Sequence, residues 1–238
     1  MLVKEQRIRS VKYNFIMNAL LTVSSVIFPL ITFPYISRVL LPAGVGKVYF
    51  ANSIISYFNI FAQLGIPTYG IRACAKVRDD RKELSRTVQE IFFINTITTS
   101  LSYCCFVILL LLIPKFKENT MLLLTASLSM VFNTIGIEWM YKGLEQYSYI
   151  TKRFIIAKII AFIAVFLFVR DADDSILYCG ISVFAGGASF IFNFFMRGDT
   201  SNLNRSEHIV SKNILDLSVC SLGWHVPQQY QPILILLC

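Results

Sequence analysis

Six long runs of apolar residues, each almost free of charge, constrain this 238-residue chain more than any other feature. The runs cover residues 13–33, 48–66, 91–113, 121–137, 154–169 and 176–196. Lengths of about 16 to 23 residues suit helices that cross a hydrocarbon layer roughly 30 Å thick. The pattern therefore predicts an all-α membrane protein, a polytopic bundle of about six transmembrane helices.

Composition favours a membrane protein over a soluble one. Apolar residues make up 55% of the chain, charged residues 15%, and the mean hydropathy is +0.62. Soluble domains carry about 25% charged residues. The first run is longer than the apolar core of a secretory signal and has no small-residue cleavage site after it. We therefore expect it to remain as the first span.

The distribution of the net charge of +8 predicts a topology. If the connections alternate between two sides, the side of the N-terminus receives 17 Lys and Arg. The other side receives Arg38, Lys47, Lys115, Lys117 and Arg170. This asymmetry predicts a multi-pass membrane protein with a cytoplasmic N-terminus. The basic residues follow no zinc spacing and no aromatic-interleaved motif, so we expect the lipid bilayer, and not nucleic acid, as their partner.

The runs also divide the chain. We expect a basic cytoplasmic arm at 1–12, the six-span bundle at 13–196, and a cytoplasmic linker with the start of an incomplete seventh span at 197–223. Residues 224–238, rich in Gln and Pro, form an aberrant tail. Our hypothesis is a shifted reading frame and a truncated product. Downstream nucleotides that encode no further apolar spans in the other frames would contradict it.

Two kinds of connection are expected within the bundle. The segment 67–90 alternates basic and acidic residues and predicts an amphipathic cytosolic helix. The connections on the outer side are short turns, and Pro34, Pro42, Gly44 and Gly46 shape the first of them.

No pattern of catalytic or metal-binding residues appears in the sequence. His208 and His225 have no Cys or carboxylate at ligand spacing. Cys104 and Cys105 are adjacent, so on a helix their side chains point about 100° apart. The serines and threonines in the runs have no activating base. We expect no enzyme activity, no metal and no cofactor.

Polar residues inside the first two runs form helical stripes. In the first run Asn14, Asn18, Thr22 and Ser25 share one face, and in the second run Asn52, Ser56, Asn59 and Gln63 do. A polar stripe on a membrane helix faces protein or water. The two stripes are candidates for lining a hydrophilic cavity that binds substrate. The alternative is hydrogen bonding between helices without transport.

Three charged residues join these candidates. Arg38 and Arg72 bracket the second run, where their guanidinium groups could bind a pyrophosphate at a cavity mouth. The alternative is that they only anchor the topology. Glu138 is either a carboxylate at the membrane interface or the site of proton coupling.

Three stretches resemble one family. They are Phe33-Pro34-Tyr35-Ile36-Ser37-Arg38-Val39-Leu40, Leu64-Gly65-Ile66-Pro67-Thr68-Tyr69-Gly70-Ile71-Arg72, and Glu138-Trp139-Met140-Tyr141-Lys142-Gly143-Leu144-Glu145-Gln146-Tyr147. Together they resemble the polysaccharide-export flippases, the O-antigen translocases of the multidrug/oligosaccharidyl-lipid/polysaccharide superfamily. The resemblance covers residues 1 to 220, the N-terminal half of such a protein. Leu41 stands where the family's turn usually has Gly.

The resemblance implies a transporter. It would flip undecaprenyl-pyrophosphate-linked oligosaccharide repeat units across the inner membrane for O-antigen and surface polysaccharide synthesis. Its lobes would alternate access around a central site, and a polysaccharide polymerase and a chain-length regulator are implied partners. Three alternatives stay open: a multidrug exporter of the same superfamily, a homodimer of half-transporters, and an inert membrane fragment.

Overall fold

The structure is a computed structural model that describes residues 11–195, with the backbone alone for Val11, Arg81 and 188–195. The described part is helical. Its helices are α1 (Val11–Val39), α2 (Leu41–Gln63), α3 (Ile66–Lys76), α4 (Arg81–Leu112), α5 (Pro114–Lys117), α6 (Thr120–Gly136), α7 (Glu138–Gly143), α8 (Tyr147–Phe168) and α9 (Ser175–Phe195).

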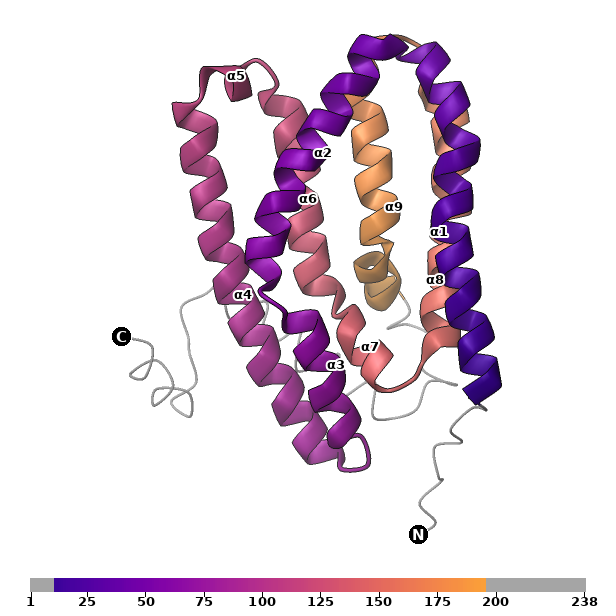
Figure 1. The fold of residues 1–238 in the computed structure, drawn as a ribbon, viewed down its shortest axis with the longest axis vertical. Coiled ribbons are helices and arrows are strands. Elements are labelled where there is room, and N and C mark those ends of the chain that lie inside the picture. The colour runs from indigo at the N-terminus through magenta and orange to yellow at the C-terminus, as the bar shows by residue number, and fades with distance from the viewer. Residues whose placement is uncertain (1–10, 196–238) are drawn as a thin grey trace.

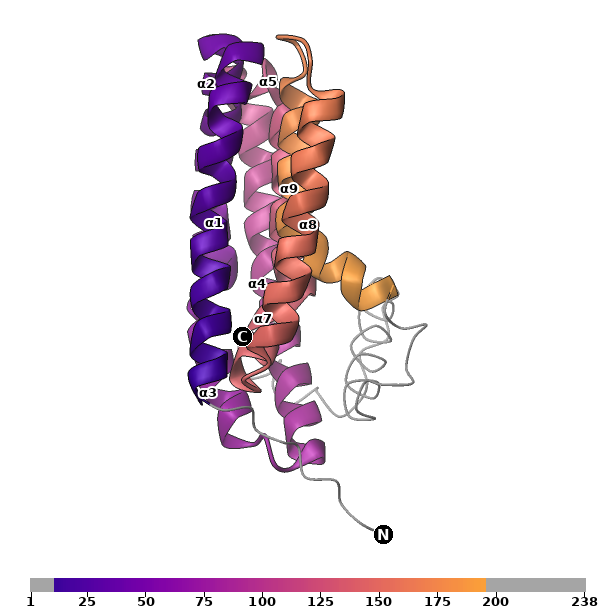
Figure 2. The same cartoon turned by 90° about the vertical axis from the view of Figure 1, so that its right-hand side faces the viewer.

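Six of these helices are long and run along the same axis (Figure 1). Turned by 90°, α1 and α2 lie on one side of the bundle and α8 and α9 on the other (Figure 2). The connections alternate between two ends. The apical end holds the α1–α2 turn, α5 and the α8–α9 loop; the basal end holds α3 and α7.

The outer surface suits a hydrocarbon solvent. Large apolar side chains such as Phe15, Leu30 and Leu101 are more than 70% exposed, which water would penalise. Two helices of the described part, Lys12–Val39 and Lys82–Leu112, are long and apolar enough to cross a membrane by length and composition alone. The prediction of an all-α membrane protein is confirmed. That all six long helices cross the membrane stays a prediction.

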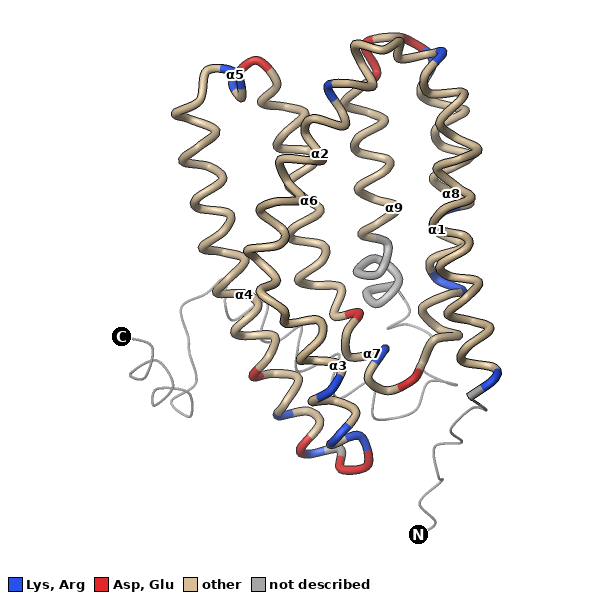
Figure 3. The backbone as a smooth tube through the Cα atoms, viewed as in Figure 1, with Lys and Arg blue, Asp and Glu red and all other residues tan. Residues whose placement is uncertain are grey.

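Charged residues gather at the two ends of the bundle, as Figure 3 shows. The basal end carries the basic and acidic residues of α3, α7 and the start of α4. At the apical end, Arg38 lies in the last turn of α1 and Lys47 in the first turns of α2, and the Arg170 amide donates to the Asp174 carboxylate of the α8–α9 loop. Lys158 lies inside the apolar length of α8, where its long stem can reach toward the basal end.

Two expectations about the connections are wrong. The segment 67–90 is not one helix: α3 ends at Lys76, and a new helix starts at Arg81, because the Asp80 side chain caps it by accepting the amides of Lys82 and Glu83. The first outer turn is also tighter than expected. Helix α1 continues through Pro34 to Val39, and α2 begins at Leu41.

Leu41 makes that turn possible with a left-handed backbone, φ 57°. This is the conformation that glycine adopts without strain. The Gly that the family resemblance implies at this position therefore has a physical reason, and Leu41 adopts the same conformation at a cost in conformational free energy.

Packing divides the bundle into separate cores. The α2–α6 core consists of Val48, Ala51, Ile55, Ala62, Phe106, Leu110, Phe116, Leu122, Leu123, Ala126, Met130, Cys179 and Val183. The α3–α7 core consists of Ile66, Cys74, Leu84, Val88, Ile91, Phe92, Ile137, Trp139, Met140, Tyr141 and Ile150. A third, small core joins α1 to α8 through Ile36, Leu40, Val165 and Val169.

Several domain predictions lie outside the described residues. They are the linker and seventh span at 197–223, the tail at 224–238, and all but the end of the arm at 1–12. These stay predictions.

Candidate functional site: a polar pocket between α1, α7, α8 and α9

The candidate site is a pocket of about 290 Å³ toward the basal half of the bundle. Four helices supply its walls (Figure 1). The lining residues are Asn18, Leu21, Thr22 and Ser25 of α1, Glu138 and Lys142 of α7, Ile150, Arg153 and Phe154 of α8, and Ala185 and Gly186 of α9.

The α1 stripe supplies neutral hydrogen-bonding groups. Thr22 Oγ1 donates to the carbonyl of Asn18 at 3.0 Å, and Ser25 Oγ donates to the carbonyl of Thr22 at 2.6 Å. Each hydroxyl therefore donates its hydrogen bond within the helix and can still accept one from a ligand through its oxygen lone pairs. The side-chain amide of Asn18 can also donate. Asn14, one turn below, is buried and does not line the pocket.

Helix α7 supplies a carboxylate and an ammonium group. Lys142 Nζ lies 3.0 Å from Glu138 Oε1, four residues apart on this short helix. Both side chains are partly exposed, at 34% for Lys142 and 44% for Glu138. Such a pair contributes about 0–1 kcal/mol to stability, so a ligand can separate the two charges at little cost.

Arg153 is the most enclosed charge at the pocket. It is 4% exposed, and its guanidinium lies 5.7 Å from the ring centroid of Tyr141 and 5.2 Å from that of Tyr149. The two rings are themselves 5.1 Å apart. Cation–π contacts of this kind hold a guanidinium in place.

The pocket therefore combines two cations with one carboxylate, for a formal net charge of +1. An anion would gain from Arg153 and Lys142, and a polyhydroxyl group would gain from the α1 stripe. The arrangement suits a ligand with phosphate and sugar parts.

The α2 stripe lies elsewhere. The Asn59 side chain accepts from Asn133 Nδ2 of α6 at 3.2 Å, and Ser56 donates to the carbonyl of Asn52 at 2.7 Å. Neither these residues nor Gln63 line the pocket. Helix α2 packs against α4 and α6, whereas α1 packs chiefly against α8.

The two arginines singled out in the sequence are also apart from the pocket. Arg38 is exposed near the apical end of α1, and Arg72 is exposed on α3 at the basal end. The structure brings Glu138 together with three of the four α1 stripe residues, but it does not bring the two stripes together.

Sequence reasoning missed Lys142 and Arg153 as pocket residues and counted them only as topological charges. For Lys142 a usable signal existed, because it follows Glu138 by four residues in a helical stretch. For Arg153 the signal was weaker: an Arg beside several tyrosines at the start of an apolar run.

An apolar groove adjoins this pocket. It has a volume of about 500 Å³, lies between α8 and α9, and shares Ala185 with the polar pocket. Small side chains such as Ala161, Ala164 and Gly180 leave the space, and Phe184 forms part of one wall. A hydrocarbon chain fits this lining better than a polar group does.

The described residues hold no group of three or more His, Cys, Asp or Glu that could bind a metal ion. Cys74 is buried in the α3–α7 core, and this burial raises the pKa of its thiol to about 11. The Cys74 thiol is therefore protonated at neutral pH and unreactive.

Comparison with known proteins gives two findings. Residues 11–221 match the family described as polysaccharide biosynthesis protein. Over 165 residues the chain is 23% identical to a protein of Escherichia coli (strain K12) described as "Putative O-antigen transporter". The match covers 69% of this chain and 40% of that relative, so the chain spans less than half of the relative's length. No solved structure matches significantly.

Proposed function

The chain belongs to the polysaccharide biosynthesis protein family, and on this premise we propose that it flips lipid-linked oligosaccharide units across the bacterial inner membrane for O-antigen or other surface polysaccharide synthesis. The observation that carries the proposal is the polar pocket, where two cations meet a stripe of sugar-compatible groups. Family and relative both point to a transporter and not to an enzyme.

Different residues of the pocket bind different parts of the substrate. Arg153 and Lys142 hold the pyrophosphate of an undecaprenyl-pyrophosphate carrier, because guanidinium and ammonium groups bind phosphate oxygens with charge-assisted hydrogen bonds. Asn18, Thr22 and Ser25 bond the first sugars. The apolar groove between α8 and α9 receives the isoprenoid tail next to the headgroup.

Glu138 links binding to an ion gradient in this proposal. In this structure it is paired with Lys142. A phosphate that takes Lys142 leaves Glu138 without its counter-charge, which favours proton uptake. Proton binding and substrate binding then support each other.

The orientation follows from the charges. The basal end carries the larger share of Lys and Arg (Figure 3), so it faces the cytoplasm, and the N-terminus with it. Alternating access requires a second bundle around the central site. That bundle comes from a further part of a longer protein or from a second copy. A polysaccharide polymerase and a chain-length regulator act on the flipped product.

The experiment is complementation of a flippase-deficient strain by this chain, scored by long-chain surface polysaccharide and paired with a test of membrane insertion. We expect the chain to restore the polysaccharide and Lys142→Ala to reduce it about tenfold. Lys76→Ala, which removes an exposed basal cation outside the pocket, should act like the unchanged chain. No restoration by an inserted chain would contradict the proposal for this chain alone.

A further inference from the structure

Two helices of the bundle break side by side. Helix α2 ends and α3 begins at Leu64, φ 37°, and Gly65, φ 76°. Helix α6 ends and α7 begins at Ile137, φ 44°. Because α2 packs on α6 and α3 packs on α7, the breaks lie at one level of the bundle.

The backbone at these breaks is strained. A left-handed conformation is unfavourable for any residue except glycine, and it is an outlier for a β-branched residue such as Ile137. Residues held in this way cluster at switch regions and hinges. The surrounding packing must therefore favour the breaks strongly in the observed conformation.

The two large cores separate at this same level. The α2–α6 core reaches down to Ala62 and Met130, and the α3–α7 core starts at Ile66 and Ile137. The breaks thus mark the upper edge of the α3–α7 core, because Ile137 is itself a buried member of that core and Ile66 follows Gly65 directly. The bundle is thus divided into two packed units by a seam.

Helix α4 crosses this seam with polar contacts. Thr98 Oγ1 donates to the carbonyl of Ala62, in the last turn of α2, at 2.6 Å. The hydroxyls of Thr99 and Thr134 lie 2.8 Å apart, and Ser102 donates to the carbonyl of Phe58 at 2.9 Å. Hydroxyl contacts like these can exchange partners as helices shift, and threonines bonded to their own helix ease bending of α4.

The unit below the seam is internally rigid. A Cβ added at Gly70 of α3 would lie 2.5 Å from the Trp139 ring of α7, and one at Gly143 would lie 2.8 Å from Cys74 Cβ. Arg78 and Glu145, in the segments that follow α3 and α7, form an ion pair at 3.4 Å. Helices that approach this closely move together.

Unsatisfied polar atoms accompany the seam. Asn95 of α4, 2% exposed, has no partner for Oδ1, and Trp139 has none for Nε1. Buried polar atoms without partners are rare in native structures. Each unpaired atom raises the free energy of the observed conformation, so a conformation that pairs it would be favoured in this respect.

We propose that the α3–α7 core swings as one body against the α2–α6 core, with the paired breaks Leu64–Gly65 and Ile137 as its hinge. The swing carries Glu138 and Lys142 of α7 toward or away from the α1 stripe, and so widens or closes the polar pocket. The hinge does not depend on the identity of the substrate. It can be right if the proposed function is wrong, and the reverse also holds.

The two breaks offer variants with opposite effects. Gly65→Ala puts a side chain on a backbone of φ 76° and should lower the share of the observed conformation about tenfold. Ile137→Gly removes the strain at φ 44° and should raise that share by a similar factor. Gly46→Ala is the control, because a Cβ there meets nothing within 4 Å inside α2.

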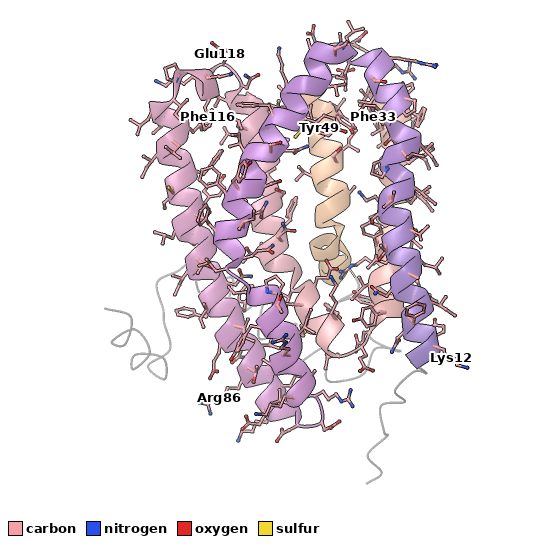
Figure 4. The ribbon with its side chains drawn as sticks, viewed as in Figure 1. Lys12, Phe33, Tyr49, Arg86, Phe116 and Glu118 are labelled. Atoms are coloured by element: carbon pink, nitrogen blue, oxygen red, sulfur yellow. The ribbon has the colours of Figure 1, made fainter. Side chains whose placement is uncertain are left out.

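Distances between spin labels in liposomes test the swing directly. One pair joins position 12 of α1 to position 86 of α4 at the basal end, and a reference pair joins positions 38 and 118 at the apical end; Figure 4 shows Lys12, Arg86 and Glu118. Labels on non-canonical ketone side chains leave the native cysteines in place.

We expect two populations of the basal distance. Gly65→Ala and Ile137→Gly should shift the ratio of these populations in opposite directions, while a single apical distance stays unchanged in both variants. The apical pair also reports that each variant is folded. A single basal distance that neither variant changes would overturn the hinge. Basal and apical distances that broaden together would overturn it as well, since they would indicate general loosening.

Discussion

The stripes of α1 and α2 have the same spacing but different surroundings. On α1, Thr22 and Ser25 face a pocket that also contains Arg153 and Lys142. On α2, Asn59 is bonded to Asn133 of α6, and Ser56 is exposed outside the pocket. The difference comes from the neighbours: α4 and α6 pack against α2, while α1 rests chiefly on α8.

A polar stripe therefore shows that a helix face avoids lipid, but it does not show that the face lines a pocket. Whether the face lines a pocket depends on which charged groups other helices bring to it. In this protein the charges come from α7 and α8, two elements that sequence spacing does not connect to α1.

The largest difference is expected between Thr22→Leu and Ser56→Leu. Both residues are exposed, and both hydroxyls donate to the carbonyl four residues earlier in their own helix. Thr22→Leu fills the polar pocket with a branched apolar side chain, so transport should fall at least tenfold. Ser56→Leu should leave transport within twofold. Equal losses in a complementation assay normalised to membrane protein would mean that the stripes do not differ.

A smaller difference is expected between two carboxylates. Glu138 pairs with Lys142 in the pocket, and Glu145 pairs with Arg78 outside it. Each exposed pair is worth about 0–1 kcal/mol, so Glu138→Gln and Glu145→Gln should have similar melting temperatures.

Their transport should separate them. Glu138→Gln should lower it roughly three- to tenfold and flatten its dependence on pH, whereas Glu145→Gln should keep both. If the pH profile is the same in the two variants, Glu138 has no coupling role.

Substitutions in the α2 stripe should lower the stability of the fold without lowering transport. Asn59→Leu removes the acceptor of the Asn133 amide, and this should lower the free energy of unfolding by about 1 kcal/mol. Asn52→Leu, in the same stripe, should change it by less. Transport per folded molecule should stay unchanged in both. A loss of transport in Asn59→Leu at normal stability would place the α2 stripe in the path.

The smallest effect is expected at the apical loop, remote from both stripes. The amides of Asp171 and Arg170 donate to the Asp174 carboxylate, each at 2.9 Å, and hold its pKa below the ordinary value. A lowered pKa stabilises the fold above the unfolded-state pKa of about 4, and this contribution is lost as the pH falls through the folded-state pKa.

Asp174→Asn should therefore slightly reduce thermal stability at neutral pH and make it less sensitive to acid below about pH 4. Transport at neutral pH should not change. An acid profile identical to that of the unchanged chain would show that the Asp174 cap contributes nothing.

Sequence could predict the helices and their polar faces, because length and spacing express these directly. It could also have located the α2–α3 break, since Gly65 and Pro67 are breaker residues. The apolar run 121–137 does end where α6 meets α7. The sequence could not predict the left-handed backbone at that point, because Ile137 contradicts its own backbone preference and only tertiary packing holds it there.

The pocket charges were beyond sequence for a related reason. Arg153 depends on the rings of Tyr141 and Tyr149, and Lys142 depends on the short helix that follows Ile137. Each is placed by contacts between elements. The spacing of residues within one element carries no record of such contacts.

The central claim is that the polar pocket holds the anionic headgroup of a lipid-linked glycan. Its most direct test is the affinity of the purified chain for undecaprenyl pyrophosphate in detergent, compared between Arg153→Ala and Lys152→Ala. Lys152 is the adjacent cation on α8 but is exposed and outside the pocket. Melting temperatures and Arg153→Lys, which keeps the charge, control for misfolding. We predict at least a tenfold weaker affinity for Arg153→Ala and less than twofold for Lys152→Ala. Equal affinities in the two folded variants would contradict the claim.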